Sequence, residues 1–127
     1  MTNLSASRES YPNQSDLMWS RSEQAAARKA FDAALRRELH DVMQEAKQMA
    51  SKIRQSSDLW ELEHYLTQRR KEIDRKYDYR YSELAHVFGR LLHEGRLSEE
   101  QLSALQEAKL RPIRSYAKFL AEMDAVA

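Results

Sequence analysis

The sequence predicts an all-α protein built on a long antiparallel helical hairpin, with a small helical head at its C-terminal end. Only 2 glycines and 2 prolines occur among 127 residues, far fewer than the turns of a sandwich, a barrel or a doubly wound sheet require. Charged residues make up 32% of the chain and hydrophobic residues 42%, which is typical of helices with one solvated face. Apolar residues also recur at heptad spacing in two long segments, and such seams predict paired helices.

The same pattern divides the chain into three regions. Residues 1–18 are polar and predict a disordered N-terminal arm, because they offer too little apolar surface to offset the entropy of ordering. Residues 19–76 predict the helical hairpin, which is also the expected dimerisation region. Residues 77–127 predict the helical head.

The first helix of the hairpin has a clear start signal. Ser20 can cap it, with Glu23 three residues later as the capping-box partner, and nothing breaks the helix before about Ser56. A helix on the order of 50 Å long cannot bury its own apolar stripe. We therefore expect the stripe to form the dimer interface, through Leu35, Leu39, Val42, Ala46, Met49 and Ile53.

The second helix is expected from about Asp58 to Lys76, with Asp58 and Glu61 as its capping box. Its heptad seam consists of Leu59, Leu62, Leu66, Arg69 and Ile73. The short connection between the two helices favours an antiparallel hairpin. Because two seams cover each other only in part, we expect a homodimer in which a second copy completes a coiled-coil-like four-helix layer.

The head is predicted to contain three further helices. The first covers residues 77–94, although its tyrosine-rich start also alternates as a strand would, and it ends at Gly95 in a C′ position. Its apolar face consists of Tyr77, Tyr81, Leu84, Phe88 and Leu91. A capping box at 98–101 then predicts a helix that ends near Arg111, and Pro112 fits the first turn of the last helix.

Trp60 stands apart from the seam of the second helix. At 100° per residue it points well away from the leucines, and the residues that extend its face or flank it are Glu63, His64, Thr67, Arg70 and Lys71. A tryptophan beside histidine and arginine has the composition of an interface hot spot. The alternative is a tryptophan that covers a neighbouring helix or the dimer partner.

Several function classes find no support. The chain has no cysteine, no Gly-rich phosphate loop and no nucleophile elbow, so we do not expect an enzyme. Two Glu-x-x-His pairs, Glu61 with His64 and Glu83 with His86, have the spacing of di-iron ligands. Both pairs point away from the apolar faces, so we expect no metal and consider a metal-dependent bundle enzyme only as a remote alternative.

Charge and hydropathy limit the partners and the compartment. The net charge is +1, and the basic residues of 69–80 are interleaved with acidic ones, so no nucleic-acid partner is expected. No apolar run approaches the length of a membrane span and no signal peptide is visible, so we expect a cytoplasmic protein.

The residues between Asp58 and Ser82 form a specific pattern. It consists of Asp58-Leu59-Trp60, Leu66, Arg70, Glu72-Ile73-Asp74 and the continuous run from Lys76 to Ser82. With Trp19-Ser20 before it and Phe88 and Glu94-Gly95 after it, this pattern resembles the signature of the fluorescence recovery protein family.

The resemblance implies an all-α homodimeric accessory protein of cyanobacterial photoprotection, with no chemistry and no cofactor of its own. Such a protein binds photoactivated orange carotenoid protein, with the C-terminal domain of that protein as the expected contact. It helps the partner detach from the thylakoid-associated phycobilisome and speeds its return to the orange form, which ends non-photochemical quenching. By the same resemblance, Trp60 and Arg70 match positions of the family's functional surface.

An alternative function follows from the positions that differ. The family has His-Asp after Trp-x-Leu where this sequence has Glu63-His64, and His86 replaces an aromatic head residue implicated in partner contact. The alternative is a divergent homologue that binds a different protein partner. The residues expected to bind the partner are Trp60, Glu63, His64, Thr67, Arg70, Lys71 and His86.

Overall fold

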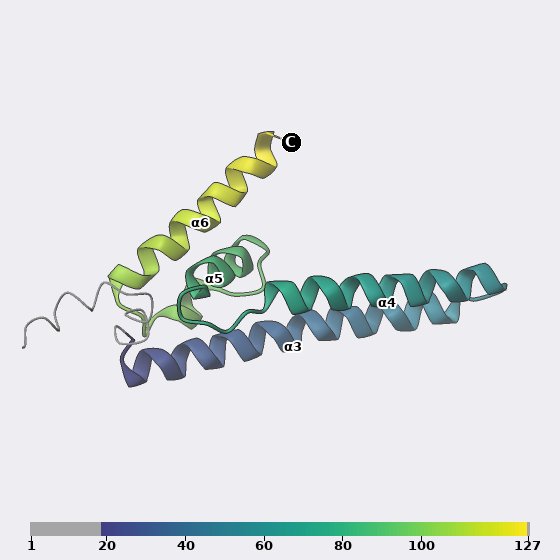
Figure 1. Ribbon diagram of the computed structural model, residues 1–127, viewed down its shortest axis with the longest axis horizontal. Helices are drawn as coiled ribbons and strands as arrows, with labels where there is room; N and C mark the ends of the chain where they lie inside the picture. The colour runs from purple at the N-terminus through teal and green to yellow at the C-terminus, as the bar shows by residue number, and fades with distance from the viewer. Residues whose placement is uncertain (1–18, 127) are drawn as a thin grey trace, which may run out of the picture.

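The computed structural model describes residues 19–126. The predicted arm, residues 1–18, lies outside the described residues. All regular elements of the described chain are helical, so the predicted all-α class is confirmed (Figure 1). The elements are α3 (Arg21–Ser51), α4 (Ser56–Lys76), α5 (Leu84–His93), the 3₁₀ helix η1 (Glu99–Leu102) and α6 (Glu107–Val126).

Helices α3 and α4 form the long hairpin (Figure 1). The predicted capping box at the start of α3 is confirmed, because the Ser20 side chain accepts from the amide of Glu23 at 3.2 Å and the Glu23 carboxylate accepts from the amide of Ser20 at 3.0 Å. The helix ends at Ser51, earlier than the expected end near Ser56.

The predicted start of α4 is wrong in detail. The helix begins at Ser56 with Gln55 as its N-cap, so Asp58 is the N3 member of the capping box and Glu61 is not part of it. The Asp58 carboxylate accepts from the amides of Arg54 and Gln55, at 3.0 and 3.3 Å. One side chain thus satisfies two backbone donors of the reversal between the helices, which shortens the turn.

The segment between α4 and α5 corrects the third predicted helix. Residues 77–83 are not helical, and α5 begins only at Leu84. Tyr77 and Tyr79 both meet Phe31 edge-on, with ring centroids 5.4 and 4.9 Å apart. Tyr81 packs against Trp19 at 5.2 Å. Alternate residues of an extended segment share one face, whereas a helix would place Tyr79 on the side opposite to Tyr77 and Tyr81.

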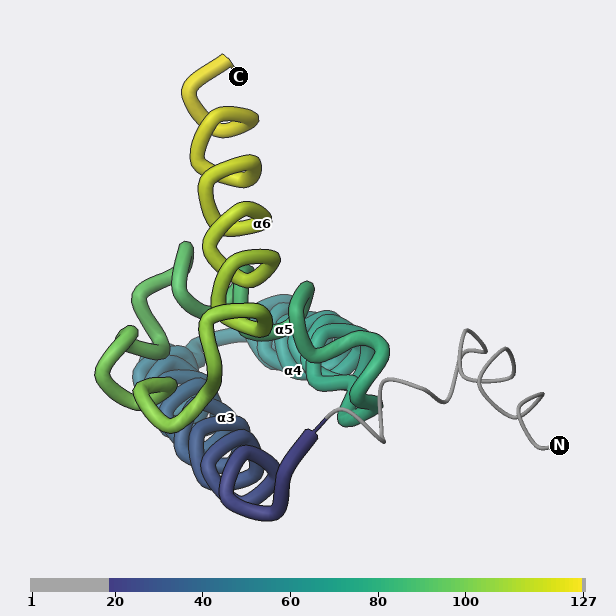
Figure 2. The backbone as a smooth tube through the Cα atoms, turned by 90° about the vertical axis from the view of Figure 1, so that its left-hand side faces the viewer, coloured from purple at the N-terminus to yellow at the C-terminus, as the bar shows by residue number. Residues whose placement is uncertain are grey.

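The head packs on the N-terminal half of α3 (Figures 1 and 2). That half offers a face of small residues around one aromatic ring, namely Ala27, Ala30, Phe31 and Ala34, all buried. Against it lie the apolar side chains of α5, η1 and the loops beside them, Leu84, Phe88, Leu91, Leu97 and Leu102. The predicted face of α5 is therefore correct for Leu84, Phe88 and Leu91, which are fully buried.

The end of the head differs from prediction. The capping box of Ser98 with Gln101 is present, but it opens the short 3₁₀ helix η1 rather than a longer α-helix. No helix ends near Arg111, and Pro112 lies inside α6 rather than at its start. Gly95 occupies the predicted position after α5, with a φ of +76° that glycine adopts without strain.

Buried Glu23 fixes the start of α6 to the start of α3. Besides its cap contact, its carboxylate accepts from the amide of Gln106 at 2.9 Å and from Lys109 at 3.1 Å. Burial acts to raise the pKa of Glu23, but hydrogen bonds from Ser20, Gln106 and Lys109 outweigh it and lower the pKa to about 2. The carboxylate thus stays ionised and joins segments more than 80 residues apart.

The apolar stripe of α3 is only partly covered within one chain. Leu35, Val42, Ala46, Met49 and Ile53 are half-buried, and Leu39 is exposed. The predicted dimer interface remains a prediction. None of the described helices is long and apolar enough to cross a membrane.

Gly89 allows the close crossing of α5 and α6, which gives a direct test of the packing in the head. A Cβ at this position would lie 2.9 Å from the carbonyl oxygen of Ile113 and 2.9 Å from the Cβ of Tyr116. We predict that Gly89→Ala lowers the unfolding free energy by about 1–3 kcal/mol because the two helices must separate. Helix propensity alone predicts the opposite sign, about 1 kcal/mol of stabilisation. A raised melting temperature would therefore show that the helices do not cross this closely.

Candidate functional site

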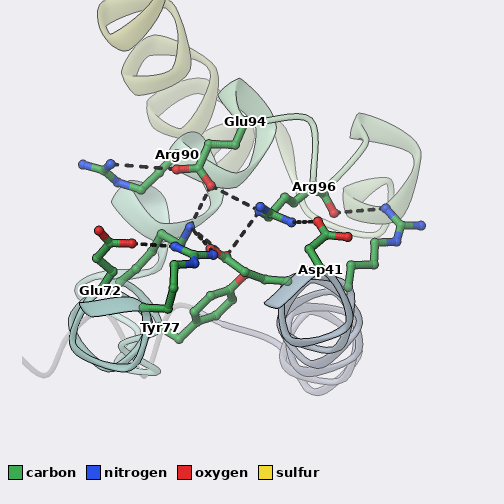
Figure 3. Close-up of polar contacts among 10 residues, drawn as sticks. Asp41, Glu72, Tyr77, Arg90, Glu94 and Arg96 are labelled. Carbon is green, nitrogen blue, oxygen red and sulfur yellow. Dashed lines mark hydrogen bonds and ion pairs between the residues drawn. The ribbon is translucent and has the colours of Figure 1, made fainter. Parts of the chain in front are cut away.

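A buried carboxylate lies where the hairpin meets the head. Glu38 of α3 is 1% exposed and accepts from Arg69 at 2.7 Å, from Lys76 at 2.9 Å and from the Tyr77 hydroxyl at 2.8 Å. Nε of Arg96, in the loop after α5, lies 3.3 Å from it. We call these five residues the Glu38 cluster; Figure 3 shows it with its outer partners.

The outer partners tie the cluster to both parts of the molecule. Arg96 also pairs with Asp41 at 2.8 Å, and its carbonyl accepts from Arg37 at 3.0 Å. Lys76 pairs with Glu94 at 2.8 Å (Figure 3). The loop after α5 is thereby held to both helices of the hairpin.

The electrostatics of the cluster favour its charged form. Burial acts to raise the pKa of Glu38, but hydrogen bonds from Lys76, Arg69 and Tyr77 lower it to about 2. The same carboxylate, together with burial, raises the pKa of the Tyr77 hydroxyl, which stays protonated and acts as a donor. Such a network stabilises one arrangement of its elements when every member is paired.

Sequence reasoning missed Glu38, although a signal was present. Arg69 occupies a position in the predicted heptad seam of α4. A charged side chain in an apolar seam requires a partner of opposite charge. Glu38 is such a partner, and it directly precedes seam residue Leu39 on the facing helix.

The predicted partner-binding residues of α4 are largely exposed. Trp60 is 62% exposed, and with His64 it lines an open groove of about 680 Å³ along α4. Tyr65, Gln68 and Arg69 continue the lining toward the head. Among residues 19–126, the tryptophan therefore does not cover another helix.

The other side of the exposed face of α4 carries two charged residues of the predicted binding set, Glu63 and Arg70. The Glu63 carboxylate accepts from the Thr67 hydroxyl at 3.0 Å. Arg70, whose side chain is 85% exposed, lies 3.9 Å from Asp74. Lys71 is exposed between the two flanks. These contacts within one helix are weak at an exposed surface, so the side chains can exchange them for contacts with a partner.

His86 lies apart from the other predicted residues, on α5. Its ring packs edge-on against Tyr116 of α6, with centroids 4.8 Å apart. It lines a second groove, of about 770 Å³, between α4 and the head. Arg69 and Glu72, which form an ion pair, line both grooves, so the groove beside Trp60 and the groove beside His86 adjoin at these two residues.

The Glu-x-x-His pairs are not brought together. Glu61 and His64 are exposed on α4, and His86 lies 4.0 Å from Glu83 on α5. Within residues 19–126 no group of three or more His, Asp or Glu side chains is placed to hold a metal ion. The surface of α4 and α5 presents charged groups, aromatic rings and apolar side chains.

Known proteins match the chain over most of its length. The family model described as photoprotection regulator fluorescence recovery protein matches residues 19–117. The fluorescence recovery protein of Synechocystis sp. is 39% identical over 100 residues, which cover 79% of this chain and 92% of the relative.

Two solved structures share the fold at the same level of identity. The Fremyella diplosiphon fluorescence recovery protein aligns with a TM-score of 0.75 and the Synechocystis sp. PCC 6803 protein with 0.76. Each is 39% identical to this chain, and the alignment covers 79% of this chain and 98% of the other. The all-α fold is therefore shared with experimentally solved relatives.

The Glu38 cluster predicts how stability depends on pH. A carboxylate whose pKa falls from 4.5 to about 2 on folding stabilises the protein above pH 4.5, and this contribution is lost as the pH falls toward 2. We predict that Glu38→Gln lowers the unfolding free energy at pH 7 by roughly 3–5 kcal/mol, because it leaves buried cations uncompensated. The variant should also lose part of the pH dependence between 4.5 and 2, measured by chemical denaturation.

The matched control is Glu45→Gln, which removes an exposed carboxylate from the same helix. It should leave both the stability and the pH profile close to the wild type. If both variants behave alike, Glu38 does not hold the hairpin and the head together.

Proposed function

Because the chain belongs to the fluorescence recovery protein family, we propose that this regulator of photoprotection binds orange carotenoid protein and speeds its return to the inactive orange form. The proposal includes an encounter with the C-terminal domain of the partner and an action without cofactor or bond chemistry. It also places the chain in the cytoplasm, at the phycobilisome.

One observation carries the proposal: the exposed surface of α4 around Trp60 and Arg70. Both side chains are exposed on one helix, Arg70 with only a weak pair to Asp74 at 3.9 Å, and both positions match the family's functional surface. Trp and Arg are the residue types that contribute most to binding free energy at protein interfaces. A tryptophan that no element of the described chain covers favours a role in binding.

The head supplies the second part of the proposed contact. His86 and Tyr116 line the second groove, which shares Arg69 and Glu72 with the groove beside Trp60. A partner domain that spans both grooves would touch both the hairpin and the head. The Glu38 cluster supports this reading because it fixes the two parts relative to each other before binding, which reduces the entropy lost on association.

We also propose that the chain acts as a homodimer through the hairpin. Besides Trp60, four large apolar side chains of the hairpin are exposed: Leu39, Met43, Leu59 and Leu66. Helical periodicity in an antiparallel pair directs them to the same side, opposite the side on which Glu38 meets the head. A second hairpin laid against this face would bury them and complete the four-helix layer.

A divergent homologue with a different protein partner is the second candidate function, and one observation favours it. Glu63 and His64 occupy exposed positions beside Trp60, so the charge pattern that a partner meets differs from the family's His-Asp. Charge complementarity is a main source of partner discrimination. The exchange therefore alters the part of the surface that selects the partner.

The recovery reaction tests the proposal. We predict that the unmodified chain accelerates the dark return of red orange carotenoid protein only weakly, followed by absorbance. The double change Glu63→His with His64→Asp should raise the rate, because it restores the family's charge pattern. Trp60→Ala and Arg70→Ala, made in that background, should each weaken binding by about 2 kcal/mol, roughly 30-fold.

Lys47→Ala, on the exposed surface of α3, is the control and should leave the recovery rate unchanged. If neither the wild type nor the restored variant accelerates the recovery, orange carotenoid protein is not the partner. Full activity of the unmodified chain would instead show that positions 63 and 64 do not discriminate between partners.

The dimer has its own test. We predict that the wild type sediments as a dimer at micromolar concentration and that Leu39→Glu dissociates it, because a charge placed in the apolar face costs several kcal/mol. Gln44→Glu introduces the same charge on the opposite, exposed side of α3 and should leave the dimer intact. A monomeric wild type would refute the proposed four-helix layer.

A further inference from the structure

The C-terminal helix carries an apolar strip that nothing in the described chain covers. Phe119, Met123 and Val126 are 51%, 54% and 84% exposed. Pro112 and Tyr116 precede them at spacings that continue a heptad, so the five residues lie along one side of α6. We call Pro112, Tyr116, Phe119, Met123 and Val126 the α6 strip.

Contacts between other residues of α6 and α5 keep this strip on the solvent-exposed side of the helix. Ile113 is buried against α5, and the close crossing at Gly89 fixes the helix there. Farther along, His93 and Asp124 lie 2.6 Å apart and tie the end of α6 to the end of α5. Figures 1 and 2 show α6 rising away from the hairpin, so the strip is accessible to another molecule.

The first part of the α6 strip contains a stacked aromatic pair beside a shallow hollow. The rings of Tyr116 and Phe119 stack with centroids 6.0 Å apart, and Arg111, Pro112 and Ser115 complete a shallow hollow of about 500 Å³ beside them. Phe119, at the edge of the hollow, and Met123, one turn farther along α6, are exposed. A surface with a hollow at one end and exposed apolar side chains at the other can meet a copy of itself in antiparallel orientation.

The charges beside the strip have the same self-complementary arrangement. Arg111 and Glu122 lie on the same flank of α6, about 16 Å apart along the helix at 1.5 Å per residue. Neither forms an ion pair within residues 19–126. When two such helices pair antiparallel, the same flanks face each other, so Arg111 of each copy comes opposite Glu122 of the other.

We propose that the α6 strip is an interface between two copies of this chain, separate from the hairpin face. Most of its exposed part, residues 118–126, lies beyond the segment that matches the family, which ends at residue 117. The interface is isologous: the strip packs on itself, and two Arg111–Glu122 pairs flank it. In the hairpin dimer it joins dimers into tetramers, and a chain whose hairpin face is disrupted dimerises through α6 alone.

The strip is short compared with a stable interface of about 800 Å² per partner, so the association is weak and dependent on concentration. Sedimentation of the full chain over a wide concentration range tests it. The wild type should pass from dimer to tetramer, whereas Phe119→Asp with Met123→Asp should remain a dimer. Ala121→Asp, on the opposite exposed side of α6, is the matched control and should behave as the wild type.

Charge exchange tests the antiparallel register. Glu122→Arg or Arg111→Glu alone should weaken the second association step by about tenfold. Both changes in one chain recreate the pairs with reversed sign and should restore it. Circular dichroism of each variant confirms that α6 remains helical.

The Leu39→Glu background separates this inference from the proposed function. In that background the chain should still dimerise, and Phe119→Asp with Met123→Asp should abolish the remaining dimer. The inference is wrong if the wild type never exceeds a dimer at the highest concentration, or if the strip variant and the control associate equally. If the variant with both charges exchanged does not regain the second association step, the antiparallel register is wrong.

Discussion

The carboxylate of Glu38 is the point at which four segments of the chain meet. It belongs to α3 and holds Arg69 and Lys76 of α4, the hydroxyl of Tyr77, and Arg96 of the loop after α5. A buried ion pair contributes little net stability, but removal of one partner is costly. The cluster therefore acts mainly on geometry: it selects one position of the head on the hairpin, and the groove between α4 and the head, beside His86, depends on that position.

Rules that concern neighbouring residues, such as helix capping and periodicity, were sufficient to predict the structure of segments that are stabilised by their own residues. The Ser20–Glu23 capping box, the two long helices and the turn at Gly95 follow from capping, periodicity and backbone freedom. The prediction was wrong where residues distant in sequence determine the local structure. Phe31 and Trp19 draw the three tyrosines of 77–81 into an extended segment, and Glu23, far away in sequence, binds the residues around the start of α6.

The same division holds for the proposed binding surface. The exposure of Trp60 and Arg70 could be predicted, because one helix places both side chains off its own seam. The position of His86 in a groove that α4 also lines could not be predicted, because it depends on how α5 packs in the head. Glu38 was hidden for a related reason, because its partners lie more than 30 residues away along the chain.

Hydrogen exchange of the amides around the Glu38 cluster tests the central claim most directly. The amide of Tyr77 bonds to the carbonyl of Ile73, and that of Arg96 to Leu91, both at 2.9 Å. If Glu38 fixes the head on the hairpin, Glu38→Gln should accelerate exchange at these two amides far more than in the middle of α4. Equal protection in the variant and the wild type would contradict the account, because the head would then be held without the carboxylate.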